Sequence, residues 1–369
     1  MSEWLNARNI LAVRLDNIGD VVMLAPALRA IKETSPAARL TLLASPAGSS
    51  AAALLPWVDD VMTLRPVWQD INGGIPFDPT RERSLIDRIA ERRFDAALIF
   101  TSFRQTPHPA GYLCYLAGIP LRAGESKEFG GGTLSDELAS APDDLHQVER
   151  NLRLVECLGF TVRDRRIVIA IPTEAHRSAG ALLRAHGIDP RRPYVLLHPG
   201  ASAEARRYPP ERFGEVARIL TDRGLPVLVT GTGREQATID AVLERAPRAV
   251  SLVDATSLTE YAALIEQASL VICGNTLPMH LADAVGTPVV ALFAGTDLES
   301  QWRPRFAPSA LLRRPTACRP CYLFTCPIGR ACLDIPPGDV VVAAEELLHE
   351  PATTAPAIAQ LAQMEGHQP

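Results

Sequence analysis

The first segment suited to chemistry follows a short apolar run near the N-terminus, where residues 14–20 read RLDNIGD. A glycine just before an acidic residue at a helix start lets the backbone approach a ligand closely. Asp20 is then either a general base or a cap of the following helix, and the local sequence by itself favours the cap. No GxGxxG pattern follows the apolar run, so this segment does not indicate a dinucleotide-dependent oxidoreductase.

A second loop, residues 198–210 (HPGASAEARRYPP), also follows an apolar run and precedes a helical pattern. Its small residues expose backbone N–H groups, and two adjacent arginines supply charge and paired donors for phosphate oxygens. The alternative is a solvated arginine pair on a surface turn. The position between a strand and a helix favours an anion site, with Ser202, Arg206 and Arg207 as candidate ligands.

Two further loops occupy equivalent positions. Residues 275–280 (NTLPMH) begin a helix whose N-terminal N–H groups and His280 are suited to phosphate, although a first-turn histidine more often caps or packs. Residues 231–235 (GTGRE) place Glu235 where it can accept hydrogen bonds from ribose hydroxyls, or where the helix dipole merely favours an acid. Ligands of open α/β sheets bind outside the carboxyl ends of the strands, so these loops together indicate one binding edge.

Apolar runs and helical patterns alternate along the chain, which predicts two successive α/β domains with parallel sheets covered on both faces. A chain of 369 residues also exceeds the usual size of one hydrophobic core. We expect an N-terminal domain over residues 1–170, a charged and irregular linker with one helical stretch over 171–192, and a C-terminal domain over 193–345. Residues 346–369 are expected to form a tail, either loose or as a helix that returns to the N-terminal domain.

Composition excludes several classes of protein. With 47% hydrophobic and 21% charged residues, the chain falls in the globular range. A net charge of -5 argues against nucleic-acid binding through a broad basic surface. The N-terminus lacks a secretory signal pattern, and no apolar run reaches the roughly 18 residues of a membrane span. We therefore expect a cytoplasmic protein, for which peripheral contact with the inner membrane surface stays open.

The cysteines form a separate feature. An odd number, seven, without an export signal predicts reduced thiols. The count of the clustered group suits Zn²⁺ or an iron–sulfur cluster, but zinc sites more often show two short cysteine pairs. We expect a metal-free structural loop, with bound metal or redox-sensitive pairing as the alternatives. The clustered residues are Cys318, Cys321, Cys326 and Cys332.

In order, the segments RLDNIGDVVMLAPALRAIKE, LLHPGASAEARRYPPERF, GTGRE and GNTLPMHLADAVGTPVVALF resemble glycosyltransferase family 9, the ADP-heptose:lipopolysaccharide heptosyltransferases. The resemblance covers most of the chain and is loosest over residues 68–129. It implies a GT-B fold, in which two doubly wound Rossmann-like domains face a central cleft. It also implies that the donor binds mainly to the second domain and the acceptor to the first.

The resemblance assigns roles to individual residues. Asp20 matches the catalytic aspartate of the family, which favours the base over the cap. Arg206 stands where the family usually has a phosphate-binding lysine, Tyr208 stands where tryptophan is frequent, and Glu235 matches the residue that holds the nucleotide ribose. The implied donor-binding residues are Gly19, Ser202, Arg206, Arg207, Gly231, Glu235, Asn275, Thr276, Leu277, Pro278, Met279 and His280.

One loop departs from the family pattern Asp-Thr-Gly-Pro-x-His at two positions. Asn275 keeps the hydrogen-bonding capacity of aspartate without its charge, and Leu277 adds bulk where the family has glycine. The departure bears on the identity of the donor more than on the fold.

The function implied is an inverting sugar transfer, most simply of heptose from ADP-heptose, with no cofactor and no metal required. Asp20 would take the proton of an acceptor hydroxyl while donors at the phosphates stabilise the leaving nucleoside diphosphate. The expected acceptor is the lipopolysaccharide core or a small-molecule glycoside. Its candidate contacts are Arg14, Asn17, Arg104, His108, Lys127 and Glu128.

Two rival functions come from other classes of protein. Asn275 and Leu277 suggest a non-catalytic protein that binds sugar nucleotides. The cysteine cluster suggests a metal or redox protein.

Overall fold

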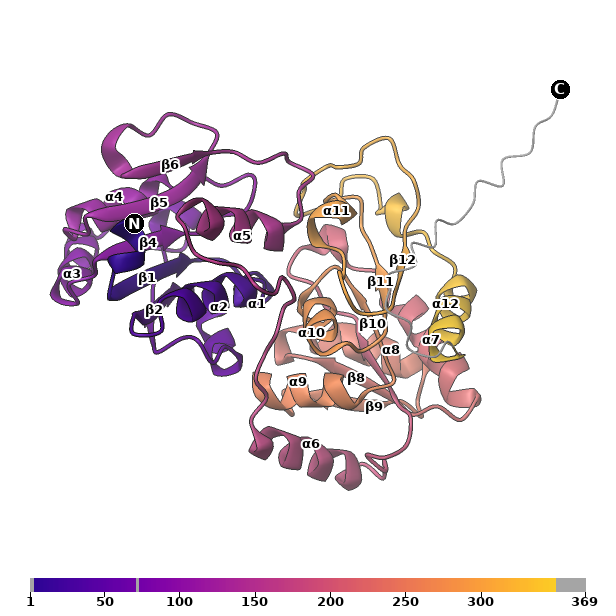
Figure 1. Cartoon of the computed structure of the whole chain (residues 1–369). Coiled ribbons are helices and arrows are strands. Elements are labelled where there is room, and N and C mark those ends of the chain that lie inside the picture. The colour runs from indigo at the N-terminus through magenta and orange to yellow at the C-terminus, as the bar shows by residue number, and fades with distance from the viewer. Residues whose placement is uncertain (1–2, 71–72, 350–369) are drawn as a thin grey trace. The chain divides into compact units, whose positions relative to one another are not determined.

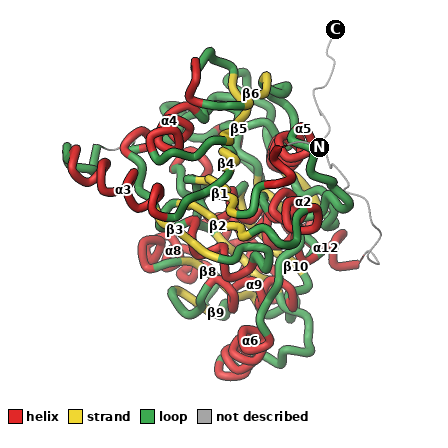
Figure 2. Tube along the Cα trace, turned by 60° about the vertical axis from the view of Figure 1, so that its left-hand side comes forward, coloured by secondary structure: helices red, strands yellow, loops and turns green. Residues whose placement is uncertain are grey.

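The computed structural model describes residues 3–70 and 73–349. The chain divides into two compact units, Met1–Ala170 and Ile171–Pro369. Each unit contains one sheet of six parallel strands. Helices cover the sheets, as the ribbon and tube views show (Figures 1 and 2). The two parallel sheets confirm the predicted α/β fold class.

In the first unit the strand order is β3-β2-β1-β4-β5-β6. Helices α2 and α5 pack together on one face of the sheet, and α3 and α4 pack together on the other (Figure 1). The strands are β1 (Asn9–Arg14), β2 (Arg39–Ala44), β3 (Asp60–Thr63), β4 (Ala96–Ile99), β5 (Leu121–Ser126) and β6 (Asp136–Ala139). The α-helices are α1 (Ile18–Val22), α2 (Ala25–Thr34), α3 (Pro79–Glu91), α4 (His108–Leu116) and α5 (Gln147–Cys157), with short 3-10 helices η1 (Glu3–Asn6), η2 (Gly48–Leu54), η3 (Val67–Gln69) and η4 (Gly131–Thr133).

In the second unit the strand order is β12-β11-β10-β7-β8-β9. Helix α7 packs against α8 and α12, whereas α9 packs against α6 and α10. The strands are β7 (Val195–His198), β8 (Val227–Gly231), β9 (Val250–Val253), β10 (Leu270–Gly274), β11 (Val289–Leu292) and β12 (Ser309–Leu312). The helices are α6 (Thr173–Ala185), η5 (Glu204–Arg206), α7 (Pro210–Asp222), η6 (Gly233–Glu235), α8 (Gln236–Arg245), α9 (Leu258–Gln267), α10 (Leu277–Val285), α11 (Glu299–Trp302), η7 (Ala331–Leu333) and α12 (Pro337–His349).

Both sheets follow the same winding rule. The first strand of each unit is central, the next two strands lie on one side of it, and the last three lie on the other. The chain therefore reverses direction across the sheet between β1 and β4 in the first unit, and between β7 and β10 in the second. Ligands of doubly wound sheets bind at this reversal, outside the carboxyl ends of the strands. A ligand site is therefore expected at the two pairs of loops that follow these strands.

The segments expected as linker and tail contain helices. Residues 171–192 include α6, which packs against α9, and His176 Nε2 lies 2.5 Å from Glu266 Oε2 across this contact. Helix α12 continues to His349, past the expected domain end at residue 345. The expected tail beyond residue 349 lies outside the described residues. Within the described part of the chain, no helix is both long and apolar enough to cross a membrane.

Tyr208 anchors the loop after β7 in the core of the second unit. Its ring is almost fully buried, and it meets the Phe213 ring edge-on with the ring centroids 4.9 Å apart. Its hydroxyl donates a 2.6 Å hydrogen bond to the carbonyl oxygen of Ile335. Burial raises the pKa of Tyr208 to about 12, so the hydroxyl keeps its proton at neutral pH.

Tyr208→Phe is expected to lower the free energy of unfolding by about 0.5–1.5 kcal/mol, the net value of one hydrogen bond. The loss should be no larger, because Arg212 Nη1 also donates to the Ile335 carbonyl, at 3.2 Å. Urea denaturation followed by circular dichroism measures the change. A loss of several kcal/mol would show that the hydroxyl supports more of the loop than this one contact.

Candidate active site

At the reversal of the first sheet, Arg14 joins two carboxylates and a serine. Its Nη2 donates to Asp20 Oδ1 at 3.0 Å and to Ser102 Oγ at 2.8 Å. Its Nε lies 2.9 Å from Asp16 Oδ2. The guanidinium is fully buried, whereas 13% of the Asp16 side chain and 16% of the Asp20 side chain are exposed. Asp20 is therefore the more accessible of the two carboxylates, because Asp16 Oδ2 is buried and Asp16 Oδ1 accepts a hydrogen bond from Gln105.

Asp20 takes part in a helix cap and an ion pair at once. Its Oδ2 accepts a hydrogen bond from the backbone N–H of Asn17 at 3.2 Å, which completes a capping box at the start of α1. Asn17, a predicted acceptor contact, is the exposed N-cap residue of this helix. Gly19 is the predicted donor-binding residue that lies in the first unit, and it is buried within α1. The capping role of Asp20 does not conflict with a role as base, because its carboxylate remains partly exposed.

Three further residues complete the cluster, and the sequence did not single them out. Gln105 Nε2 donates to Asp16 Oδ1 at 2.6 Å, and Gln105 Oε1 accepts from the backbone N–H of Ser102 at 2.8 Å. Burial raises the pKa of Asp16, the charge of Asp20 adds to the rise, and Arg14 opposes it. Ser102 and Gln105 follow β4, so their position just after a strand was the available signal.

The predicted acceptor contacts do not all present free side chains. Arg14 is buried against Asp16 and Asp20, so it meets these carboxylates in place of an exposed ligand surface. The imidazole of His108 lies 2.8 Å from Thr133 Oγ1 through Nδ1 and 2.9 Å from Ser126 Oγ through Nε2. A Cβ on Gly130 would lie 1.8 Å from this ring. His108, at the start of α4, thus packs against the segment that runs from the end of β5 to η4.

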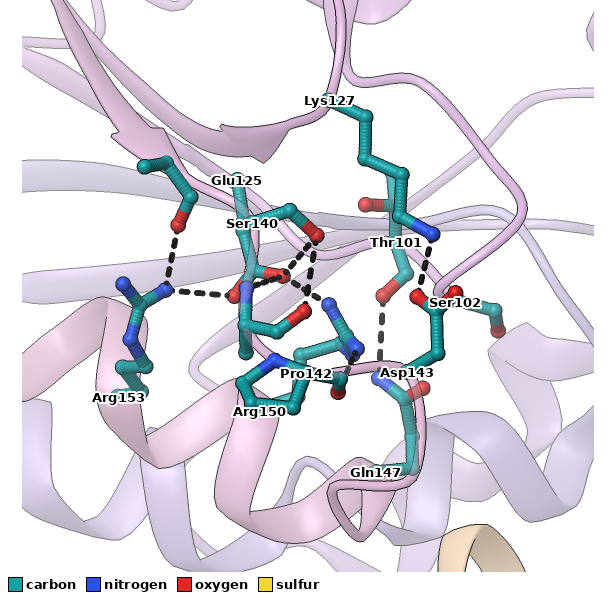
Figure 3. Close-up of polar contacts among 12 residues, drawn as sticks. Thr101, Ser102, Glu125, Lys127, Ser140, Pro142, Asp143, Gln147, Arg150 and Arg153 are labelled. Carbon is teal, nitrogen blue, oxygen red and sulfur yellow. Dashed lines mark hydrogen bonds and ion pairs between the residues drawn. The ribbon is translucent and has the colours of Figure 1, made fainter. Parts of the chain in front are cut away.

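Arg104, Lys127 and Glu128 are exposed. Figure 3 shows Lys127 reaching down to the Asp143 carboxylate, next to Ser102. Its Nζ also lies 5.8 Å from the centroid of the Phe103 ring. Lys127 therefore lies over the loop that carries Ser102, which places it near the Arg14 cluster.

A buried ion pair with helix α5 holds the end of β5 in place, next to the loop that contains Ser102, as Figure 3 shows. Glu125 lies near the end of β5. Its carboxylate pairs with Arg150 and Arg153 of α5, and Arg153 Nη1 lies 3.0 Å from Glu125 Oε2. Gln147 Nε2 donates to the Thr101 carbonyl at 3.0 Å. Helix α5 therefore holds both the end of β5 and the start of the loop that contains Ser102.

At the reversal of the second sheet, Arg206 binds two residues that follow β11. Its Nη2 lies 2.8 Å from Asp297 Oδ2, and its Nε donates to Thr296 Oγ1 at 3.2 Å. Thr296 and Asp297 are nearly fully buried, while 29% of the Arg206 side chain is exposed. The guanidinium is thus held through Nε and Nη2 while part of the side chain stays exposed, an arrangement suited to an anion. The sequence did not predict Thr296 or Asp297, although both follow an apolar strand.

The loop after β10 touches the same place. A Cβ on Gly274 would lie 3.4 Å from the carbonyl oxygen of Arg206. Burial lowers the pKa of His280 to about 4, with Arg206 adding to the effect and Asp283 opposing it. The imidazole is therefore neutral at pH 7 and able to donate from one nitrogen. The other predicted residues of this loop differ in burial. Thr276 and Leu277 are half-buried, whereas Asn275, Pro278 and Met279 are buried.

The other arginine of the pair behaves differently. Arg207 Nε donates to the Ala201 carbonyl at 2.9 Å, within its own loop. Ser202 lies on the same loop and is exposed. Arg206 is thus the member of the pair that joins the loop after β7 to the loop after β11.

Glu235 lies above the ends of β7 and β8. Its Oε2 accepts from the backbone N–H of Thr232 at 2.9 Å, so it also forms a capping box. A Cβ on Gly200 would lie 1.7 Å from Glu235 Oε1, and one on Gly231 would lie 3.1 Å from Glu235 Oε2. The two glycines therefore make room for this carboxylate at the strand ends.

Comparisons with known proteins identify the family. The profile of glycosyltransferase family 9 (heptosyltransferase) matches residues 83–331. The chain belongs to glycosyltransferase family 9. Lipopolysaccharide heptosyltransferase 3 of Escherichia coli strain K12 is 31% identical over 235 residues, which cover 58% of this chain and 63% of that protein. The match thus spans less than two thirds of that relative.

Solved structures support the family 9 assignment at the level of fold. The glycosyl transferase family 9 protein of Veillonella parvula DSM 2008 superposes with a TM-score of 0.74 at 19% identity, covering 92% of this chain and 97% of that chain. The ADP-heptose LPS heptosyltransferase II of E. coli gives a TM-score of 0.71 at 21% identity, covering 92% and 98%. These likenesses confirm the predicted GT-B fold.

The cysteine cluster of this family 9 chain lies between β12 and α12. Cys318 is exposed, Cys321 and Cys326 are half-buried, and Cys332 is buried, all as free thiols. Across residues 3–70 and 73–349, no group of three or more His, Cys, Asp or Glu side chains is arranged to hold a metal ion. Backbone contacts join the segment to the loops after β7 and β11: Cys321 N donates to the Gly295 carbonyl, and Ala205 N donates to the Phe324 carbonyl.

Proposed function

We propose that this chain transfers a heptose from ADP-heptose to a hydroxyl group of a lipopolysaccharide acceptor, with inversion at the anomeric carbon. Membership of the heptosyltransferase family supports the reaction class. The observation that carries the proposal is the anchored but open guanidinium of Arg206 at the reversal of the second sheet. A nucleoside diphosphate is the ligand whose charge this site would complement.

The second unit is the proposed donor site. Arg206, Thr276 and neutral His280 supply donors for the diphosphate, and the N-terminus of α10 adds its backbone N–H groups. Fixed donors of this kind stabilise the charge that develops as the diphosphate departs. The proposed reaction therefore has a source of leaving-group stabilisation within the protein itself.

Asp20 of the first unit is the proposed base. In a single displacement, the acceptor oxygen attacks the anomeric carbon, the bond from that carbon to the diphosphate oxygen breaks, and Asp20 takes the hydroxyl proton. The accessible edge of its carboxylate, beside the Arg14 cluster, supports this role. The proposed acceptor is the lipopolysaccharide core, and a small-molecule glycoside is the alternative.

Gly200→Ala tests the proposed contact between Glu235 and the ribose. The new Cβ would occupy the position of Glu235 Oε1, so the carboxylate must leave the strand ends. Loss of hydrogen bonds to a charged group costs about 1.5–3 kcal/mol, so ADP affinity should fall roughly 10- to 150-fold. Isothermal titration measures the change.

Gly338→Ala is the matched control, because a Cβ there meets nothing within 4 Å. Its ADP affinity should equal that of the wild type. Folded Gly200→Ala protein with unchanged affinity would remove Glu235 from the donor site.

The direct test is a transfer assay with a panel of ADP-, UDP- and GDP-sugars, read by mass spectrometry of the products. Lipopolysaccharide core and soluble glycosides serve as parallel acceptors. A heptosylated core formed from ADP-heptose, with a β- or α-linkage opposite to that of the donor, is the expected result. Transfer from another nucleotide sugar would refute the donor assignment. Tight binding of ADP-heptose with neither transfer nor hydrolysis would identify a sugar-nucleotide-binding protein instead.

A further inference from the structure

Arg14 is shared between two carboxylates of one loop. It lies 3.0 Å from Asp20 through Nη2 and 2.9 Å from Asp16 through Nε. Because the guanidinium is fully buried, water screens these interactions less than it would at the surface. Two carboxylates thus compete for the electrostatic stabilisation that one cation provides.

A ring of contacts holds this arrangement in place. Gln105 Nε2 donates to Asp16 Oδ1 at 2.6 Å, and Gln105 Oε1 accepts from Ser102 N at 2.8 Å. Ser102 Oγ in turn accepts from Arg14 Nη2 at 2.8 Å. The ring joins the loop after β1 to the loop after β4, on the two sides of the sheet reversal. Asp16 is therefore fixed against Arg14 by a residue far along the chain.

We propose that Asp16 and Gln105 are positioning residues for Asp20, Asp16 by offsetting part of the charge of Arg14 and Gln105 by holding Asp16 there. The inference rests on the proposed role of Asp20 as base. A carboxylate beside an unopposed buried cation is strongly stabilised as an anion and accepts a proton poorly. A second carboxylate on the same guanidinium weakens that stabilisation, so Asp20 remains a stronger base.

Besides Arg14 and Asp16, the charged pair of Lys127 and Asp143 lies near this cluster, over the loop that carries Ser102, and both of its side chains are about half exposed, so solvent screens their charges. Helix η2 packs against α1, and its sequence GSSAAAL contains no titratable side chain. Helix α5 reaches the end of α1 through neutral Asn151, whose Nδ2 donates to the Met23 carbonyl at 3.2 Å. The loop after β4 carries Arg104, which is exposed. Arg14 and Asp16 are therefore the charges whose removal should be visible in the behaviour of Asp20.

Asp16→Asn gives the sharper test, read from the pH dependence of kcat/KM. Without the second carboxylate, Arg14 acts on Asp20 alone and favours its ionised form. The acidic limb of the profile should therefore move to lower pH, and the plateau should fall because the base is weaker. A side chain with only a structural role would lower the plateau without moving the limb, and that result would overturn the inference.

Asp87→Asn is the matched control, since it makes the same change of charge on the exposed face of α3 in the same unit. Its acidic limb should coincide with that of the wild type. Gln105→Met serves if Asp16→Asn does not fold, because it leaves every charge in place. It should lower kcat with an unchanged KM for the donor, and an unchanged kcat would overturn the inference.

The outcomes separate this inference from the proposed function. Near-normal kcat in an Asp20 variant would refute the base itself. An inactive Asp20 variant together with an unmoved limb in Asp16→Asn would refute only the roles of Asp16 and Gln105.

Discussion

Asp20→Ala is expected to lower kcat by about 10²–10⁴-fold, the usual contribution of a positioned general base. The dissociation constant for ADP-heptose should stay at the wild-type value, because the proposed donor contacts lie in the second unit. Steady-state transfer assays and isothermal titration measure the two quantities on the same preparation. A near-normal kcat with the true acceptor would show that another group takes the proton.

Two controls separate the base from the helix cap. Asp20→Asn can still accept from Asn17 N but cannot take up a proton, so it should be as inactive as the alanine variant. Asp78→Ala removes a different cap, one that accepts from Thr80 N and Arg81 N at the start of α3. It should cost about 1 kcal/mol of stability without loss of kcat. Loss of turnover in the Asp78 variant would mean that general destabilisation explains the Asp20 result.

The sequence predicted the fold because the signals for it are local. Short apolar runs such as residues 9–14 alternate with helical patterns, and the buried strands β1, β4, β7, β10 and β11 show such runs, whereas β5 (LRAGES) is buried without one. The ends of these runs also predicted the loops that gather at each sheet reversal. Both features depend on residues close together in the chain.

The arrangement inside each loop depends on distant partners, and the sequence could not predict it. Arg14 was expected at a ligand surface, but its side chain is buried. Its contacts with Asp16, Asp20 and Ser102 compensate for the cost of burying its charge. Asp297 pairs with Arg206 although the two residues are far apart in the chain, and neither residue identifies the other in the sequence. His108 was expected to face an acceptor, yet its ring packs on Gly130.

Loss of the Arg206 guanidinium is expected to weaken donor binding more than the Gly200→Ala change does. Arg206→Ala removes a guanidinium from the proposed diphosphate site and leaves the carboxylate of Asp297, 4% exposed, without its cation. Removing the cation from a buried contact between a guanidinium and a phosphate costs about 2–5 kcal/mol. The affinity for ADP should therefore fall by roughly 30- to several-thousand-fold. Isothermal titration of ADP measures the loss.

The double variant shows how much of that loss comes from the abandoned carboxylate. Asp297→Asn added to Arg206→Ala removes the charge that would repel the diphosphate, so affinity should recover in part but not to the wild-type value. Arg218→Ala is the matched control, because Arg218 pairs with Asp222 at 3.0 Å with both side chains about half exposed. Such a surface pair contributes little, and ADP binding should not change. Full recovery in the double variant would mean that Arg206 acts only to neutralise Asp297. Partial recovery would indicate a direct contact between Arg206 and the phosphates. Asp297→Asn cannot restore that contact, so the affinity that stays lost is the contribution of the contact.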